Sequence, residues 1–245
     1  MNLVIDIGNT RFKYAFFEEK GMTSFGFEVQ EMYRKIEQGI SQGVKIDVFL
    51  SGSGKIDAFL RARLKNYAAY WLEVASGPLL PVGISYKTPE TLGFDRVAVC
   101  VGACNLFPRK NLLVIDSGTA LTYNYVDEHA TFLGGNISPG QEIRFRSLHL
   151  FTEKLPYIKP GMTYGGCGRT TSEALLNGVM DGILYEVEGY VREFRKKYPD
   201  GQVVITGGNS LFLKDKLGPE AYFEIHLGFI GLNEILEYNK NHNET

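Results

Sequence analysis

The sequence of 245 residues predicts an α/β fold built from two similar halves. The main observation is an internal repeat, because residues 3–10 (LVIDIGNT) return in similar form at residues 113–120 (LVIDSGTA). In each copy an apolar strand ends in Asp-x-Gly and a second strand-like run follows, which predicts a β-hairpin with the Asp and Gly in its turn. The matching hairpins favour a duplication over a chance similarity of eight residues.

Strands and helices alternate in both halves, as two α/β units require. In the first half, strands are expected at 12–17, 23–28, 47–51 and 70–74, and helices at 30–38, 56–65 and 96–105. In the second half, strands are expected at 112–115, 121–126, 130–134 and 203–206, and helices at 141–150, 171–197 and 231–239. We place the boundary near residue 108, so that the expected domains span residues 1–108 and 109–245.

Composition argues against several classes of protein. The net charge of −2 and the pI of about 6.1 give no basic field for nucleic acid or an anionic membrane. No apolar run reaches the roughly 20 residues of a membrane-spanning helix, and the N-terminus lacks a signal-peptide pattern. The three cysteines are odd in number, lack the spacing of a zinc site and are expected to be small buried residues. These features predict a cytoplasmic protein that binds neither nucleic acid nor membrane.

The first Asp-Gly turn carries groups that suit phosphate and metal. Asp6, at the end of a strand, can hold magnesium, usually through water, and Gly8 lets phosphate approach the backbone. Polar side chains follow in the turn and on one face of the next strand: Asn9, Thr10, Arg11 and Lys13. An ordinary hairpin turn also favours Asp, Gly and Asn, so this segment alone leaves a structural role open.

The second Asp-Gly turn, residues 116–119, strengthens the functional interpretation of the first. Two such turns, one in each half, would face each other across a cleft and hold a nucleotide from both sides. Asp116 could then bind a cation while Thr119 contacts phosphate. A third turn, residues 206–210 (TGGNS), would let adenosine lie against its glycines, although a simple strand-to-helix turn is equally compatible. The sequence contains neither a Walker A loop nor G-x-G-x-x-G after a strand.

Five motifs occur in order along nearly the whole chain: residues 6–10 (DIGNT), 86–96 (YKTPETLGFDR), 116–120 (DSGTA), 134–140 (GGNISPG) and 155–156 (LP). The paired Asp-Gly turns and the late Gly-Gly turn resemble those of the superfamily of acetate kinase, sugar kinases, Hsp70 and actin. The run 86–96, a Tyr followed by Pro and then Gly-x-Asp-Arg, is similar to the signature of type III pantothenate kinases. The other motifs match that family as well.

The resemblance implies a duplicated ribonuclease H-like fold, the actin-like ATPase fold, in which ATP and pantothenate meet in a cleft between two similar α/β domains. It also implies ATP-dependent phosphorylation of pantothenate to 4′-phosphopantothenate, the first step of coenzyme A biosynthesis, by a homodimer. The expected cofactors are ATP, Mg²⁺ and a monovalent cation, either K⁺ or NH₄⁺.

The same resemblance assigns roles to individual residues. Asp95 is the expected general base, and Asp116 the expected ligand of the monovalent cation. The expected pantothenate contacts are Tyr86, Gly93, Phe94, Asp95, Arg96 and Thr171. The expected ATP contacts are Asp6, Ile7, Gly8, Asn9, Thr10, Arg11, Phe12, Lys13 and Thr119. From the residues alone, an Asp-Arg pair at a helix start is also typical of an N-cap with a surface ion pair.

Two departures from the family pattern and two alternative functions accompany this interpretation. Thr170-Thr171 stands where the family usually carries Asn-Thr, and residues 51–54 (SGSG) replace a turn of the Ser-Val-Val-Pro type. One alternative is a sugar or acetate kinase of the superfamily, which the run 86–96 disfavours. The other is a non-enzymatic regulatory or transcription-accessory relative, which the presence of Asp6, Asp95 and Asp116 disfavours.

Overall fold

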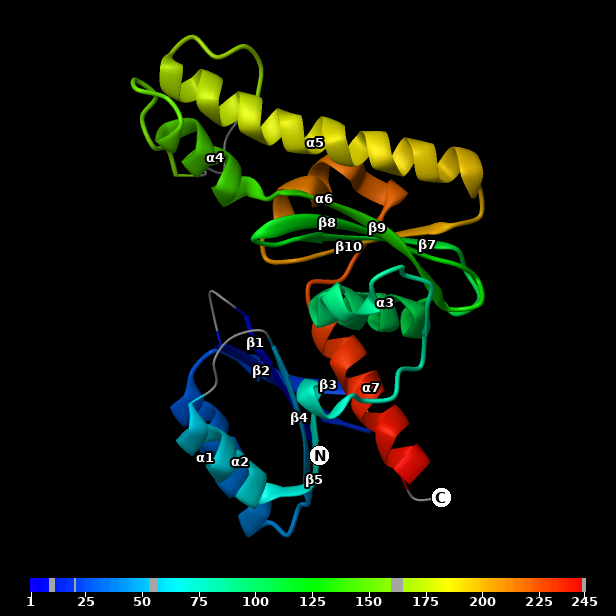
Figure 1. Cartoon of the computed structure of the whole chain (residues 1–245). Helices are drawn as coiled ribbons and strands as arrows, with labels where there is room; N and C mark the ends of the chain where they lie inside the picture. Colours follow the sequence, from blue (N-terminus) through cyan, green and yellow to red (C-terminus); the bar gives the residue numbers. More distant parts are fainter. Residues whose placement is uncertain (9–11, 20, 53–56, 160–164, 244–245) are drawn as a thin grey trace. The chain divides into compact units, whose positions relative to one another are not determined.

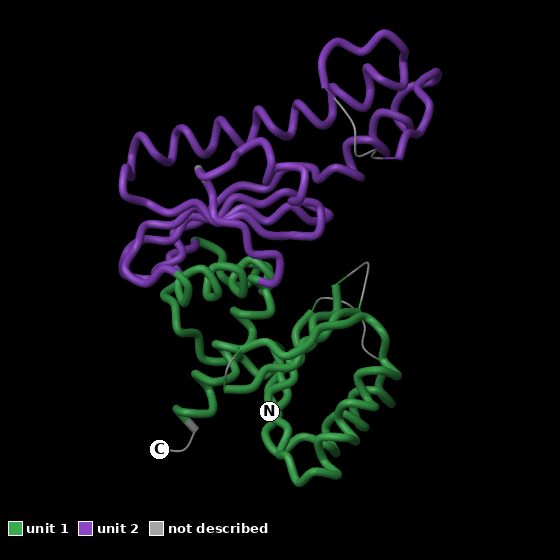
Figure 2. Tube along the Cα trace, turned by 180° about the vertical axis from the view of Figure 1, so that it is seen from behind, with its two compact units in different colours: residues 1–83, 87–106, 227–245 green, residues 84–86, 107–226 purple. Residues whose placement is uncertain are grey.

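The chain divides into two compact units. The computed structural model describes residues 1–8, 12–19, 21–52, 57–159 and 165–243 (Figure 1). Unit 1 comprises residues 1–83, 87–106 and 227–245, and unit 2 comprises residues 84–86 and 107–226 (Figure 2). Each unit has its own β-sheet and its own hydrophobic core.

Unit 1 is built on a five-stranded sheet with the order β3-β2-β1-β4-β5. Its strands are β1 (Asn2–Ile7), β2 (Phe12–Glu18), β3 (Gly21–Gly26), β4 (Ile46–Gly52) and β5 (Ala68–Glu73). The predicted hairpin is present, because β1 and β2 pair antiparallel, whereas β1 and β4 pair parallel. Asp6, however, was expected in the turn and lies within β1, paired with Lys13. Adjacent residues of β1 are fully buried, which is expected of a central strand covered on both faces.

Four helices cover the two faces of this sheet. Helices α1 (Val29–Ser41) and α2 (Ala58–Tyr67) pack on one face, and α3 (Phe94–Leu106) and α7 (Leu227–Asn243) pack on the other (Figure 1). Helices α3 and α7 cross at backbone contact, since a Cβ atom on Gly231 would lie 2.7 Å from the carbonyl carbon of Ala98. Glycine at this crossing therefore allows an approach that a larger residue would prevent.

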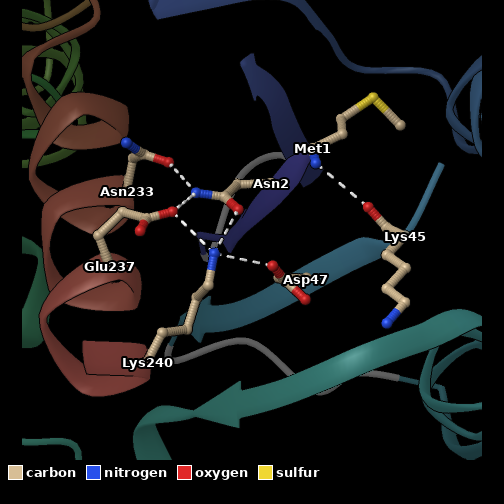
Figure 3. A network of polar contacts seen from close by, with 7 residues as sticks. All are labelled: Met1, Asn2, Lys45, Asp47, Asn233, Glu237 and Lys240. Carbon is tan, nitrogen blue, oxygen red and sulfur yellow. Dashed lines mark hydrogen bonds and ion pairs between the residues drawn. The ribbon is translucent and has the colours of Figure 1, made fainter. Parts of the chain in front are cut away.

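A polar network fixes the C-terminal helix to the sheet of unit 1 (Figure 3). Lys240 of α7 forms an ion pair with Asp47 of β4 at 2.8 Å and with Glu237 at 2.9 Å. Asn2 of β1 donates hydrogen bonds to Asn233 at 2.8 Å and to Glu237 at 2.5 Å. The last helix is thus attached to the first strand and its neighbour.

Unit 2 repeats this plan with a six-stranded sheet of order β11-β10-β7-β8-β9-β6. The strands of this sheet are β6 (Gly83–Ile84), β7 (Leu112–Ser117), β8 (Ala120–Val126), β9 (Thr131–Pro139), β10 (Gln202–Thr206) and β11 (Tyr222–Phe223). Its helices are α4 (Gln141–Leu150), α5 (Thr171–Lys197) and α6 (Leu211–Leu217). Buried side chains of α5 and α6 pack on one face of the sheet and form the core of the unit. Three short 3₁₀ segments complete the chain: η1 (Val74–Ser76), η2 (Pro89–Thr91) and η3 (Gly218–Glu220).

The strand orders confirm the predicted duplication. The order β3-β2-β1-β4-β5 in unit 1 corresponds to β9-β8-β7-β10-β11 in unit 2. In both units the first two strands form an antiparallel hairpin and the fourth strand runs parallel to the first. A helix follows the last of these strands in each copy, α3 in the first and α7 in the second. This is the duplicated ribonuclease H-like fold that the sequence predicts.

The structure differs from the sequence-based expectations in several places. The units do not follow a single boundary at residue 108, because apolar side chains of α7 such as Ile235 and Leu236 are buried in unit 1, and residues 84–86 join unit 2 beside β9. Cys100 is buried as expected, whereas Cys167 is exposed. Helix α6 and strand β11 were not predicted.

None of the helices in the described ranges combines the length and apolar character that a membrane-spanning helix needs.

Candidate functional site

The first Asp-Gly turn lies where β1 ends in unit 1. Asp6 is partly buried, and it lies opposite Lys13 of β2 and beside Ser51 of β4. Ile7 and Phe12 continue the β1–β2 pair towards the turn. Gly8 follows β1 directly, whereas the expected ATP contacts Asn9, Thr10 and Arg11 lie outside the described residues. Of the turn SGSG, Ser51 and Gly52 end β4, and the remainder also lies outside the described residues.

The electrostatics of Asp6 bring a second carboxylate into the site. Burial raises the pKa of Asp6 above its usual value, the charge of Lys13 lowers it, and the charge of Asp95 raises it further. The charge of Asp95 therefore acts on Asp6, and both carboxylates belong to unit 1. A partly buried carboxylate with a perturbed pKa, such as Asp6, is typical of a site that receives a cation or a charged substrate.

Asp95 lies in the first turn of α3 and is exposed to solvent. Its Oδ1 atom accepts a hydrogen bond from the backbone N–H of Arg96 at 2.9 Å. A Cβ atom at Gly93 would overlap this same oxygen, so the carboxylate lies directly over the backbone of the preceding loop. The Arg96 side chain is buried, with 6% of its surface exposed. The geometry fixes one oxygen of Asp95 while the side chain stays accessible to a ligand.

The second Asp-Gly turn lies where β7 ends in unit 2. Asp116 pairs with Thr122 of β8 and with Thr206 of β10. A Cβ atom at Gly207 would overlap Asp116 Oδ1 and would lie 2.6 Å from the backbone of Ser117. The carboxylate of Asp116 is thus packed against the backbone of the third, Gly-rich turn.

Two other motifs hold this second turn in place. The backbone N–H of Asn209 donates to the carbonyl oxygen of Ser117 at 2.9 Å, and its side-chain amide donates to that of Gly118 at 3.1 Å. Gly140, which ends the segment 134–140, lies so close that a Cβ atom there would overlap the carbonyl oxygen of Thr119. Thr119 itself is exposed. Each of these three motifs is recognisable in the sequence by itself, but their mutual packing was not predicted.

The remaining predicted substrate contacts lie elsewhere in unit 2. The Tyr86 ring is partly buried and lies 5.8 Å from the ring of Phe132, on β9. Thr171 is exposed in the first turn of α5. The preceding Thr170 is the cap of this helix, because its hydroxyl accepts from the N–H of Glu173 at 3.2 Å.

A buried polar residue on α5 was not predicted and holds the loop that leads to Thr171. Asn177 donates to the carbonyl oxygens of Gly165 at 3.2 Å and Gly166 at 3.0 Å, and its side-chain oxygen accepts from the N–H of Gly165 at 3.0 Å. The signal in the sequence is weak, because an Asn within a long helix gives no indication of its partners.

The candidate residues therefore form two groups, each within one unit. In unit 1, Asp6, Lys13 and Asp95 lie together. In unit 2, Asp116 lies near the end of β7 and Thr119 lies in the turn that follows this strand, whereas Tyr86 and Thr171 lie on other elements. Among the described residues, no group of three or more His, Cys, Asp or Glu side chains could hold a metal ion by itself. Mg²⁺ fits this donor set only with nucleotide phosphates as further ligands, which is its usual manner of binding in phosphoryl-transfer sites.

Comparison with known proteins identifies the family. The family model described as type III pantothenate kinase matches residues 2–193. The chain belongs to this family. Curated type III pantothenate kinases from Cytophaga hutchinsonii and Bacteroides fragilis are 36% and 37% identical over 239 residues. These alignments cover 98% of this chain and 100% and 98% of the two relatives, so the similarity to the pantothenate kinases extends over the complete relatives.

Solved structures agree with the fold. A Campylobacter jejuni protein assigned to the Baf family of transcriptional activators has a TM-score of 0.62 at 21% identity, covering 98% of this chain and 99% of that chain. A Sinorhizobium meliloti protein assigned as a 2-dehydro-3-deoxygalactonokinase has a TM-score of 0.56 at 11% identity, covering 99% of both chains. At these identities the comparison shows a shared fold and gives no support to either of those activities.

The raised pKa of Asp6 leads to a prediction about stability. A carboxyl whose pKa is higher in the folded than in the unfolded chain destabilises the folded state progressively as the pH rises through these values. We therefore expect Asp6→Asn to unfold at a higher temperature than the wild type at pH 8, with the difference shrinking as the pH falls towards about 4. Thermal unfolding across this pH range measures the effect.

Asp47→Asn is the matched control for this experiment. Asp47 lies on the neighbouring strand β4, where it forms the ion pair with Lys240, so its replacement should lower the unfolding temperature at pH 8. An Asp6→Asn variant that is less stable than the wild type at pH 8 would show that burial does not destabilise the Asp6 carboxylate.

Proposed function

We propose that the protein transfers the γ-phosphoryl group of ATP to pantothenate, forming 4′-phosphopantothenate and ADP, the first step of coenzyme A biosynthesis. The observation that carries this proposal is membership of the type III pantothenate kinase family over most of the chain. The site supports it, because Asp6, Asp95 and Asp116 each lie at the end of a strand or the start of a helix. The family also disfavours the alternatives of a sugar or acetate kinase.

Asp95 is the proposed general base. Phosphoryl transfer to an alcohol requires positioning of the reactants, neutralisation of charge and an acceptor for the hydroxyl proton. The backbone N–H of Arg96 fixes one carboxylate oxygen of Asp95, and the exposure of the side chain allows a substrate hydroxyl to reach it. A proton accepted there would leave the pantothenate oxygen as the nucleophile. Pantothenate would also contact Gly93, Phe94 and Arg96.

Asp6 and Lys13 are the proposed phosphate end of the site. Lys13 supplies positive charge opposite Asp6 across the hairpin, where it would pair with phosphate oxygens. Asp6 would hold Mg²⁺, which neutralises phosphate charge when bound. The negative charge of Asp95, which acts on Asp6, would also favour this cation. The adjoining turn residues, from Ile7 to Phe12, would complete the contacts to ATP.

Tyr86 and Thr171 are the proposed contacts to the rest of pantothenate. The Tyr86 ring offers an apolar surface supported by Phe132 and a phenolic hydroxyl. Thr171 offers an exposed hydroxyl at the N-terminus of α5, where helix N–H groups favour the binding of anions such as a carboxylate.

Asp116 is the proposed ligand of a monovalent cation, and this leads to a second prediction. A carboxylate beside a phosphate-binding turn needs a cation to offset the repulsion between like charges. We expect K⁺ or NH₄⁺ to raise turnover well above the rate in Na⁺, measured at constant ionic strength and saturating Mg²⁺. Equal rates in the three salts would exclude this role for Asp116.

A second copy of the chain is the proposed partner. Several large apolar side chains of unit 2 are exposed. They include Ile137 on β9, Leu150 at the end of α4, Phe151 directly after α4 and Tyr185 on α5. The most exposed is Phe151, at 86%. Residues of this kind are enriched at the centre of homodimer interfaces. Sedimentation should therefore give a dimer at micromolar concentration, and a monomer would contradict this part of the proposal.

The protein is proposed to act in the cytoplasm, without nucleic acid or membrane.

A coupled assay of ADP release tests the proposed function. Pantothenate, N-alkyl pantothenamides, acetate and hexoses are supplied in parallel with ATP and Mg²⁺. Pantothenate should stimulate ADP release. If acetate or a hexose stimulated ADP release while pantothenate did not, the proposal would be contradicted.

A further inference from the structure

The position of the Thr119 turn depends on the segment that ends β9. Across the β8–β9 pair, Ser138 lies opposite Leu121 and Pro139 lies opposite Ala120. Gly140 follows, and a Cβ atom there would lie 2.6 Å from the carbonyl oxygen of Gly118. A shift of residues 138–140 would therefore displace the turn itself.

Arg144, in the first part of α4, holds this segment from the other side. Its Nε atom donates to the carbonyl oxygen of Pro139 at 2.8 Å, and its Nη2 atom donates to Ser138 Oγ at 3.0 Å. The same Nη2 atom also forms an ion pair with the carboxylate of Glu186 on α5. A guanidinium fork suits this arrangement, because its donors are spread over separate nitrogens in one plane, whereas all the donors of a Lys ammonium are on a single nitrogen.

Glu186 is itself held by Tyr123, whose ring stacks on a second tyrosine. Its Oε1 atom accepts a hydrogen bond from Tyr123 of β8 at 3.0 Å. The ring of Tyr123 stacks on that of Tyr190 of α5, with centroids 3.6 Å apart and an interplanar angle of 14°. Asn136 of β9 donates to the Tyr190 hydroxyl at 3.1 Å. Burial and the neighbouring Glu186 charge raise the pKa of Tyr123, which keeps its phenol protonated as a donor.

We propose that Arg144 is a positioning residue for ATP binding. Together with Glu186 it ties β8, β9, α4 and α5 into one network whose end point is the backbone of residues 138–140, and that backbone supports the Thr119 turn. Arg144 acts through this backbone and does not need to touch the nucleotide. The inference rests on the proposed function to the extent that the Thr119 turn contacts ATP.

The substitution Arg144→Lys tests this proposal. The Lys keeps the charge opposite Glu186 but cannot also hold Ser138 and the Pro139 carbonyl group. A misplacement of about 1 Å can lower the rate of an enzyme by roughly 10²-fold. The Thr119 turn should be displaced only in part, so we expect a smaller effect, a rise of about tenfold in the KM for ATP. The KM for pantothenate should stay near its wild-type value, and the thermal unfolding temperature should fall by only a few degrees, as expected from the loss of two hydrogen bonds.

Arg146→Lys is the matched control on the same helix. Arg146 pairs with Glu142 at 2.5 Å, but its side chain is 66% exposed, whereas that of Arg144 is 20% exposed. All kinetic constants of this control should match the wild type. An unchanged KM for ATP in Arg144→Lys, or an equal rise in both variants, would overturn the proposal. A lower unfolding temperature and a lower kcat at constant KM would also overturn it, because they indicate support of the fold alone.

A binding measurement separates this inference from the proposed function. The affinity of each protein for a fluorescent ATP analogue is measured without pantothenate. Absence of pantothenate-stimulated ADP release by the wild type would contradict the proposed function but would leave this comparison decisive. About tenfold weaker nucleotide binding by Arg144→Lys than by Arg146→Lys supports the positioning role, and equal affinities overturn it.

Discussion

Asp95→Asn should lower turnover by about 10²- to 10⁴-fold, the typical cost of losing a positioned general base. The substitution keeps the size of the side chain and an oxygen that can accept the hydrogen bond from the Arg96 N–H. It removes the negative charge and the proton affinity. Folding should be intact and ATP binding nearly unchanged, so steady-state turnover with pantothenate together with nucleotide affinity checks the expectation.

The same variant tests the structural alternative for Asp95. If the side chain only stabilises the first turn of α3, Asn should replace it with little loss, because Asn and Asp are comparable at helix starts. Asp57→Asn is the matched control, since Asp57 caps α2 by accepting from the Leu60 N–H at 3.3 Å. This control should retain wild-type turnover. More than about a tenth of wild-type turnover in Asp95→Asn would rule out Asp95 as the base.

Gly207→Ala should be the most damaging conservative change in unit 2. Gly207 has a φ of +96°, a backbone conformation that residues with a Cβ atom adopt only with strain. The absence of a Cβ atom also leaves room for Asp116 Oδ1. An Ala there must displace the carboxylate or the turn. We expect turnover to fall by about 10²-fold through misplacement of the Asp116 turn, with the stimulation by K⁺ or NH₄⁺ reduced or lost.

Gly43→Ala separates backbone strain from the contact with Asp116. Gly43 also has a positive φ, +77°, but a Cβ atom there would have no neighbour within 4 Å. Ala should therefore cost stability of about 1–2 kcal/mol without affecting turnover or its cation dependence. If the two alanine variants lose turnover equally, the Gly207–Asp116 contact has no particular role.

The repeat made much of the fold predictable. The β1–β2 and β7–β8 hairpins follow from local patterns, namely β-branched runs that end in Asp-x-Gly, and the same patterns identified Asp6 and Asp116. The long helix α5 was also predicted with its observed bounds, because its apolar spacing and its capping Thr170 are local signals. Features of this kind need no knowledge of distant contacts.

The features that were missed depend on tertiary contacts. Helix α7 follows unit 2 in the chain, yet its polar network with β1 and β4 and its crossing with α3 place it in unit 1. The β9 strand extends to Pro139 through Gly134 and Gly135, residues with weak strand preference, because pairing with β8 stabilises it. The packing of Gly207 on Asp116 and the fork of Arg144 join residues far apart in sequence. The roles of the site residues as base, cation ligand and substrate contacts were predicted from the family resemblance, and they stay predictions that the experiments above test.

Identification of the phosphorylated product tests the central claim most directly. The wild-type protein is incubated with ATP, Mg²⁺, K⁺ and pantothenate, and the products are analysed by mass spectrometry and phosphorus NMR, with Asp95→Asn alongside. We expect 4′-phosphopantothenate in amounts equal to the ADP released by the wild type, and a small fraction of that amount from the variant. ADP release without phosphorylated pantothenate, or a phosphoryl group on any position other than the 4′-hydroxyl, would contradict this claim.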